Sequence, residues 1–125
     1  MRKQYYFRPS ARGYYAWDVD RLVRLTAGFT SQKVPLGDIA ELDEPISLEG
    51  TEGIPTYRQI ADDFRLVQEA DLSFPIILAA DGRVMDGMHR VVKALSTGRE
   101  TIDAVIFEED PKPDYVDVYP SELPY

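Results

Sequence analysis

Apolar residues recur at helical spacing in three stretches of the chain. The positions that share one face of the first stretch are Val19, Leu22, Val23 and Leu25. Asp18 stands before this stretch as a residue of N-cap type, and Gly28 follows it as a helix terminator. The pattern therefore predicts a first helix between Asp18 and Gly28.

A longer amphipathic stretch runs from Thr56 to Ala70. Pro55 precedes it and Thr56 begins it, and both residue types are typical of a helix start. The side chains that the pattern predicts to be buried are Ile60, Phe64, Leu66 and Val67. The side chains that it predicts to face solvent are Arg58, Asp62, Asp63, Arg65 and Glu69.

The remaining apolar runs predict strands around a third helix. Residues 74–79 have the continuous apolar character of a buried strand, and the turn dipeptide Asp81-Gly82 connects them to a short strand at 83–85. Residues 102–107 predict a last strand. The apolar positions of the third helix, which Gly98 ends, are Val91, Val92, Ala94 and Leu95.

Two further segments are interrupted by turn-forming residues. Residues 33–39 are β-prone but contain Pro35, which suggests an edge strand or a connector. Residues 41–53 contain proline and glycine breakers and predict a loop. The order of elements predicts a single compact α+β domain over 1–107 with a small mixed sheet and about three helices.

The overall charge and the length narrow the function classes. The chain has 125 residues, with 14 Lys and Arg against 22 Asp and Glu and a net charge of -8. This balance argues against a free-standing nucleic-acid binder, because neutralising phosphates requires clustered positive charge. No apolar run is long enough to span a membrane and the first residues do not form a secretory signal, so we expect a cytoplasmic protein without membrane contact.

Charge differs most between the two ends of the chain. Residues 1–16 form a basic, aromatic segment, and residues 108–125 form an extended, acidic tail rich in proline and tyrosine. Two interpretations remain open: the two ends are separately solvated, or they pair within one chain or across a homodimer. The tail is either mobile or docked by its apolar side chains, which are Tyr115, Val116, Val118 and Tyr119.

The loop from Asp86 to Arg90 joins a strand end to a helix start. Backbone N–H groups at a helix N-terminus are unpaired and the helix dipole is positive there, which favours an anion. Gly87 allows close approach of a phosphate, while His89 and Arg90 supply hydrogen-bond donors. Two interpretations stay open: a phosphate site, or a turn in which Asp86 caps a helix whose His89 and Arg90 face water.

The same region resembles the ParB/sulfiredoxin superfamily. ParB N-terminal domains place a Gly-Glu-Arg-Arg-x-x-Ala element after a strand hairpin, and Gly87-Met88-His89-Arg90-Val91-Val92-Lys93-Ala94 is similar to it. Sulfiredoxins carry Gly-Cys-His-Arg at this point, followed by an element comparable to Arg99-Glu100-Thr101-Ile102. The resemblance covers residues 74–107, and extends to residues 33–73 only through the order of elements. It implies a small stand-alone domain of ParB/sulfiredoxin-like fold.

The resemblance also implies a ligand and the residues that hold it. Gly87, Met88, His89 and Arg90 would surround the phosphates of a nucleotide, ATP, ADP or CTP, accompanied by Mg²⁺. Arg58, near the start of the preceding helix, would add a phosphate contact. Lys93, one helical turn beyond the motif, either reaches phosphate or remains in water. With one histidine and no cysteine, the sequence predicts no metal site of the protein's own.

Some members of the superfamily are free-serine kinases with a carboxylate base beside the phosphate site. The acids that stand as candidates for this base are Glu41, Glu44 and Asp86, although loop acids are more often simply solvated.

Departures from the family patterns exclude several activities. Met88 stands where sulfiredoxins have their reactive cysteine, and the chain contains no other thiol, so sulfinic-acid reduction is excluded. The sequence also lacks the helix-turn-helix reader of ParB partition proteins, which argues against specific DNA binding.

Three hypotheses follow for function. The first is binding of a nucleotide or another phosphorylated small molecule at Gly87–Arg90, with phosphoryl transfer or nucleotide hydrolysis left open. The alternative is a non-catalytic interaction module that holds a protein partner through its acidic tail. DNA binding or nuclease activity is the least favoured of the three because of the net charge of -8.

Overall fold

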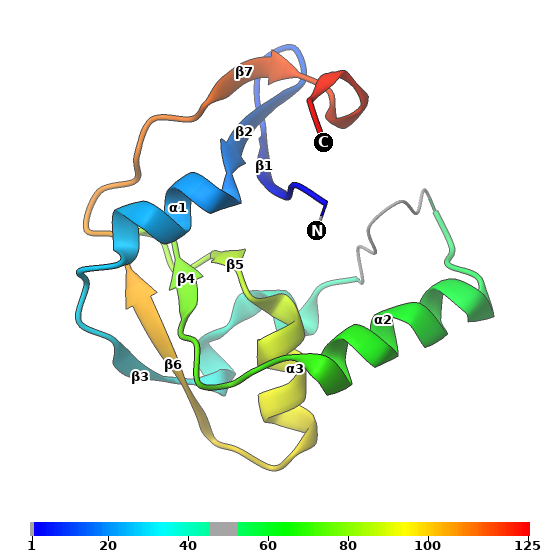
Figure 1. Cartoon of the computed structure of the whole chain (residues 1–125), viewed down its shortest axis with the longest axis vertical. Helices are drawn as coiled ribbons and strands as arrows, with labels where there is room; N and C mark the ends of the chain where they lie inside the picture. The colour runs from blue at the N-terminus through cyan, green and yellow to red at the C-terminus, as the bar shows by residue number, and fades with distance from the viewer. Residues whose placement is uncertain (1, 46–52) are drawn as a thin grey trace.

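Two small β-sheets organise the described part of the chain (Figure 1). The computed structural model describes residues 2–45 and 53–125. The first sheet has the strand order β1-β2-β7, and its strands are β1 (Tyr5–Pro9), β2 (Tyr14–Asp18) and β7 (Tyr115–Val118). The second has the order β3-β6-β4-β5, and its strands are β3 (Gln32–Pro35), β4 (Ile76–Leu78), β5 (Val84–Asp86) and β6 (Thr101–Ile106).

Three α-helices accompany the sheets in residues 2–45 and 53–125, which confirms the predicted α+β class. They are α1 (Val19–Thr26), α2 (Tyr57–Glu69) and α3 (Met88–Ser96). Short 3₁₀ turns occupy Leu36–Asp38, Ala40–Asp43 and Pro120–Glu122. Part of the predicted loop 41–53 is therefore helical, and its residues 46–52 lie outside the described part. No helix among the described residues is long and apolar enough to cross a membrane.

The second sheet is built as the sequence pattern predicts. β4 and β5 form an antiparallel hairpin, α3 follows it, and β6 returns parallel to β4 with Ile76 opposite Ala104. β3 pairs antiparallel with the outer side of β6, so the start of the segment 33–39 is an edge strand. This arrangement brings the end of β5 directly to the start of α3.

The second sheet carries apolar side chains on both faces. Ile76 and Leu78 of β4 point to the cluster that includes Val91 and Ala94 of α3. Ile77, between them, points to the opposite cluster, which contains Trp17, Leu22 and Met85. Side chains alternate along a strand, so β4 joins α3 on one face to α1 and the first sheet on the other.

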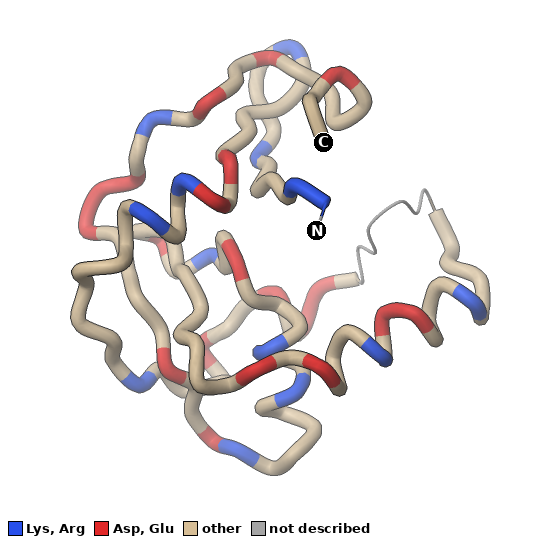
Figure 2. The backbone as a smooth tube through the Cα atoms, in the orientation of Figure 1, with Lys and Arg blue, Asp and Glu red and all other residues tan. Residues whose placement is uncertain are grey.

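The ends of the chain pair with each other, which rules out two separately solvated termini (Figure 2). β7 runs antiparallel to β2, so the tail is docked within the chain. The Trp17 indole Nε1 donates a hydrogen bond of 2.8 Å to the carbonyl oxygen of Pro111, and Arg21 lies 3.2 Å from the Asp114 carboxylate. The rings of Tyr5 and Tyr115 meet edge to face with centroids 6.1 Å apart.

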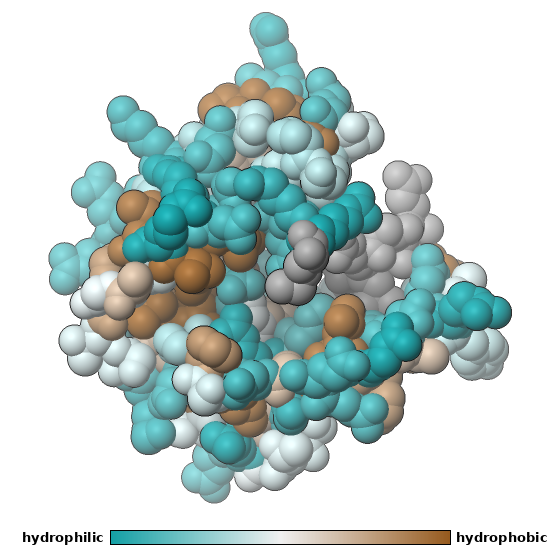
Figure 3. Space-filling view, viewed as in Figure 1, coloured by the Kyte–Doolittle hydropathy of each residue, from teal (hydrophilic) through white to brown (hydrophobic). Residues whose placement is uncertain are grey.

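The amphipathic pattern predicted more burial than α2 achieves. Ile60, Phe64 and Leu66 are 48%, 60% and 47% exposed, and only Val67 is buried. The reason is that α2 packs mainly against α3 and extends beyond the sheet, as Figure 1 shows. Val23 and Leu25 of α1 are also exposed, and Figure 3 shows apolar surface over α1 and beside α2.

A capping box fixes the start of α2. The Gln59 backbone N donates to Thr56 Oγ1 at 3.2 Å, and the Thr56 backbone N donates to Gln59 Oε1 at 2.8 Å. We expect Thr56→Ala to lower the free energy of unfolding by about 1 kcal/mol. Urea denaturation and hydrogen exchange of the α2 amides measure this. Ser31→Ala, at an exposed position, is the control, and unchanged exchange in Thr56→Ala would contradict the prediction.

One ion pair joins the first sheet to the turn between β4 and β5. The Arg8 Nη1 and Nη2 atoms donate to the two carboxylate oxygens of Asp81 at 2.8 and 2.7 Å. The hydrogen bonds from Arg8 lower the pKa of Asp81 to about 2. A carboxyl group with a lowered pKa in the folded state contributes stability above its unfolded pKa, and this contribution disappears as the carboxylate becomes protonated.

We therefore expect the Arg8–Asp81 pair to make the free energy of unfolding fall as pH is lowered from about 4 to about 2. Asp81→Asn and Arg8→Gln should each flatten that fall, because each removes one member of the pair. Urea denaturation at a series of pH values measures the slopes. Equal slopes in the wild type and both variants would show that the pair is not linked to folding.

Candidate functional site

The helix α3 starts on Gly87, in the loop that the sequence singled out. Gly87 has φ 113° and ψ 22°, a left-handed conformation, and no side chain among the described residues caps the first turn. The first intrahelical bond runs from the Val91 backbone N to the Gly87 carbonyl oxygen at 3.0 Å. Asp86 does not cap the helix as expected, because Gly87 holds the N-cap position and Asp86 belongs to β5.

Arg90 is a structural anchor of this loop. Its Nη1 donates to the carbonyl oxygens of Phe74 and Pro75 at 3.1 and 2.7 Å, and its Nη2 donates to Asp86 Oδ2 at 3.0 Å. The side chain is only 16% exposed. Arg90 therefore holds the segment before β4 against the end of β5, and both of its Nη atoms are engaged within the protein.

His89 and Lys93 connect α3 to α2. The His89 Nε2 lies 2.7 Å from Asp63 Oδ1, and the histidine side chain is 42% exposed. The Lys93 ammonium donates to the carbonyl oxygens of Gln68 and Ala70 at 2.8 and 2.6 Å, which satisfies the C-terminal end of α2. Of these two side chains, His89 is the one that stays open to solvent at the start of α3.

The other two predicted ligand residues lie differently. Met88 is partly buried, and its side chain packs against the apolar cluster that contains Val91 and Ala94. Arg58 is exposed in the first turn of α2. Among residues 2–45 and 53–125, no hydrogen bond or ion pair joins Arg58 to the Gly87–Arg90 loop.

The three candidate acids have different partners. Glu44 binds the Arg83 guanidinium with both oxygens, at 2.5 and 2.8 Å, and this contact lowers the pKa of Glu44. Asp86 is paired with Arg90. Glu41 Oε2 accepts from the Val84 backbone N at 2.5 Å, whereas its buried Oε1 has no hydrogen-bond partner among the described residues.

Two contact residues of the site were missed by sequence reasoning. Asp63 was expected to face solvent but binds His89, and Arg83 was expected only as a strand residue but binds Glu44 and lies 3.7 Å from Glu41 Oε2. These contacts join residues far apart in the chain, and no local pattern signals them. Asp63 contacts the Gly87–Arg90 loop directly, whereas Arg83 contacts only the two candidate acids Glu41 and Glu44.

Without a nucleotide, the residues around the Gly87–Arg90 loop supply few ligands for a magnesium ion. The described part of the chain contains no group of three His, Asp or Glu side chains suited to a metal ion. Asp86 and Glu44 are already paired with arginines. The phosphates of a nucleotide would therefore have to supply most of the ligands of any Mg²⁺ ion.

Comparisons of the chain with protein-family models, with curated proteins and with solved structures found no match. What the site binds is therefore inferred from its geometry, with the ParB/sulfiredoxin resemblance as an expectation.

Proposed function

We propose that this protein binds a phosphate-bearing ligand, a nucleotide by class, at the N-terminal turn of α3. The observation that carries the proposal is the start of α3 on a left-handed Gly87 without a side-chain cap from the described residues. The first backbone N–H groups of a helix have no intrahelical partner and lie at the positive end of its dipole. A phosphate oxygen satisfies such donors and places its charge where the dipole favours it.

His89 is the side chain best placed to add to these amides. One ring nitrogen contacts Asp63, and among the described residues the other, Nδ1, has no hydrogen-bond partner. A ring protonated at both nitrogens donates to Asp63 through Nε2 and to a phosphate oxygen through Nδ1. Arg90 and Lys93 would act indirectly, since they hold the loop and α2 in place.

The resemblance to the ParB/sulfiredoxin superfamily supports a nucleotide, ATP, ADP or CTP, as the ligand. Phosphoryl transfer or nucleotide hydrolysis is a further proposal that rests on Glu41. Glu41 is the candidate acid that keeps an oxygen without a partner among the described residues, whereas Glu44 and Asp86 are paired with arginines. Glu41 Oε1 would take the proton of the attacking hydroxyl or water, and it must first become accessible.

Isothermal titration with ATP, ADP, CTP and GTP, with and without Mg²⁺, tests the binding site. We expect at least one nucleotide to bind, and His89→Ala to weaken it by about tenfold through the loss of one charge-assisted hydrogen bond. Arg24→Gln, in the last turn of α1, is the control for an exposed cation. Failure of all four nucleotides to bind, or equal affinity in His89→Ala, would overturn the assignment.

Arg90→Ala is a poor test of binding, because it removes three hydrogen bonds that hold the loop.

A phosphate-release assay of the wild type and of Glu41→Gln tests turnover. This variant should keep the affinity of the wild type and lose the reaction if Glu41 is the base. A reaction that survives in Glu41→Gln would remove Glu41 from the proposal.

The alternative, protein binding through the acidic tail, has less support. Tyr115 and Tyr119 of the tail contact Tyr5 and Tyr14 of the first sheet at centroid distances of 6.1 and 6.2 Å. The tail is therefore engaged within the chain. The net charge of -8 argues against DNA binding, because neutralising phosphates requires clustered positive charge.

A further inference from the structure

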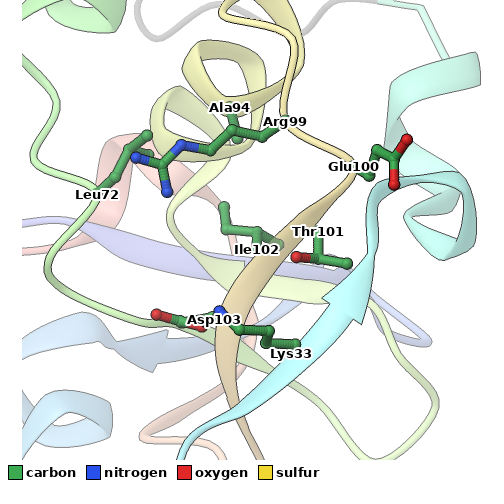
Figure 4. A pocket seen from close by; sticks show the side chains of 8 residues that line it. All are labelled: Lys33, Leu72, Ala94, Arg99, Glu100, Thr101, Ile102 and Asp103. Carbon is green, nitrogen blue, oxygen red and sulfur yellow. Dashed lines mark hydrogen bonds and ion pairs between the residues drawn. The ribbon is translucent and has the colours of Figure 1, made fainter.

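A hollow lies at the opposite end of α3 from the proposed phosphate site. It has a volume of about 340 Å³ and lies between the C-terminal part of α3, the edge of the second sheet and the segment after α2. That volume lies at the lower end of the range for small-molecule sites. The residues that line it are Lys33, Leu72, Ala94, Arg99, Glu100, Thr101, Ile102 and Asp103 (Figure 4).

One wall of the hollow is apolar and firmly fixed. Ala94 and Ile102 are buried members of the apolar cluster below α3, and the partly buried Leu72 packs against that cluster. Ala94 is fully buried and backs this wall, while Leu72 and the small exposed edge of Ile102 form its accessible, rigid surface. An apolar ligand group can lie on this surface without disturbing the core.

The charges around the hollow leave one cation without a partner in the described part of the chain. The Lys33 ammonium lies 3.2 Å from Asp103 Oδ1, so these two charges offset each other. Among the described residues, the Arg99 side chain has no hydrogen bond or ion pair. Figure 4 shows its guanidinium extending across the hollow toward Leu72, while the Glu100 carboxylate points the other way.

We propose that this hollow binds a small organic monoanion, with its carboxylate on Arg99 and its apolar body on Leu72 and the exposed edge of Ile102. The planar guanidinium fork matches the geometry of a carboxylate. One available cation suits a singly charged group better than a phosphate dianion. This site stands independently of the proposed phosphate site at Gly87, because it uses the other end of α3.

An NMR titration of the ¹⁵N-labelled full chain with hexanoate tests this proposal. We expect saturable shifts of the backbone amides of Leu72, Ala94 and residues 99–103, with a dissociation constant of about 1 mM or tighter. Hexanamide, which has the same apolar body without the charge, should bind at least about tenfold more weakly. Hexyl phosphate should bind no more tightly than hexanoate.

Two variants locate the anion. Arg99→Gln should weaken hexanoate binding at least about tenfold, and Arg24→Gln, on α1, should leave it unchanged. The spectrum of each variant reports directly whether the fold is preserved. Absence of shifts at the named amides, equal binding of hexanamide, tighter binding of hexyl phosphate or unchanged binding in Arg99→Gln would each overturn the proposal.

Discussion

Gly87→Ala should destabilise the protein by roughly 3 kcal/mol or more. Two effects add at this position. The φ of 113° is one that residues with a side chain rarely adopt, and a Cβ atom would lie 2.6 Å from Ile76 Cγ2. Ile76 is fully buried in β4, so it cannot move aside without disturbing the core. Urea denaturation measures the loss of free energy of unfolding.

Two other glycines separate the contributions of strain and collision. Gly82 has φ 89°, and a Cβ atom at this position would meet no described residue within 4 Å, so Gly82→Ala should show the backbone effect alone, about 1 kcal/mol. Gly28 has neither a positive φ nor a close neighbour among the described residues, and Gly28→Ala should be nearly neutral. We expect the loss of free energy of unfolding to be largest for Gly87→Ala, smaller for Gly82→Ala and smallest for Gly28→Ala. A Gly87→Ala protein as stable as Gly28→Ala would contradict the described start of α3.

Deletion of residues 109–125 should lower the melting temperature by about 10 °C or more, or abolish cooperative unfolding. The deletion removes β7 from the first sheet and takes away the carbonyl partner of the Trp17 indole. It also removes Leu123, a buried side chain, and the ring contacts of Tyr115 with Tyr5. Trp17 belongs to the apolar cluster of the second sheet, so the deletion should also destabilise that cluster. Calorimetry measures the change.

A shorter deletion is the matched control. Removing residues 120–125 leaves β7 in place and takes away the last 3₁₀ turn with Leu123. We expect its effect on the melting temperature to be less than half that of the longer deletion. A deletion of 109–125 that unfolds at the wild-type temperature would show that the paired ends contribute nothing to stability.

The two deletions also bear on function. Because the proposed phosphate site lies at α3, the shorter deletion should leave nucleotide affinity unchanged. If the tail holds a protein partner, that deletion should weaken partner binding, whether or not a nucleotide binds at α3. Measuring both quantities on the same protein distinguishes the two candidate functions.

The sequence predicted the second sheet well because its signals are local. The Asp81-Gly82 turn brings β4 and β5 together, and Gly87 and Gly98 lie just outside the two ends of α3. A strand hairpin followed by a helix and a returning strand has few ways to pack. The local signals accordingly predict the Gly87–Arg90 loop at the start of a helix, where the structure has it.

The roles of the side chains around the loop were beyond local reasoning. Arg90, His89 and Lys93 each have donor groups that fit an anion, and the sequence pattern predicted that they contact a phosphate. In the structure, Arg90 donates to the carbonyl oxygens before β4, His89 contacts Asp63, and Lys93 donates to the carbonyl oxygens at the end of α2. Each partner lies 15 or more residues away along the chain, so only the fold brings it near.

Short-range periodicity and backbone preference are enough to specify the helices, the hairpin and the glycine on which α3 begins. The packing of the whole chain sets three further features that no local pattern specifies. The basic and acidic ends join in one sheet, most of the apolar face of α2 stays exposed, and particular cations face solvent. These outcomes depend on which surfaces meet after the elements form, and that depends on the whole chain.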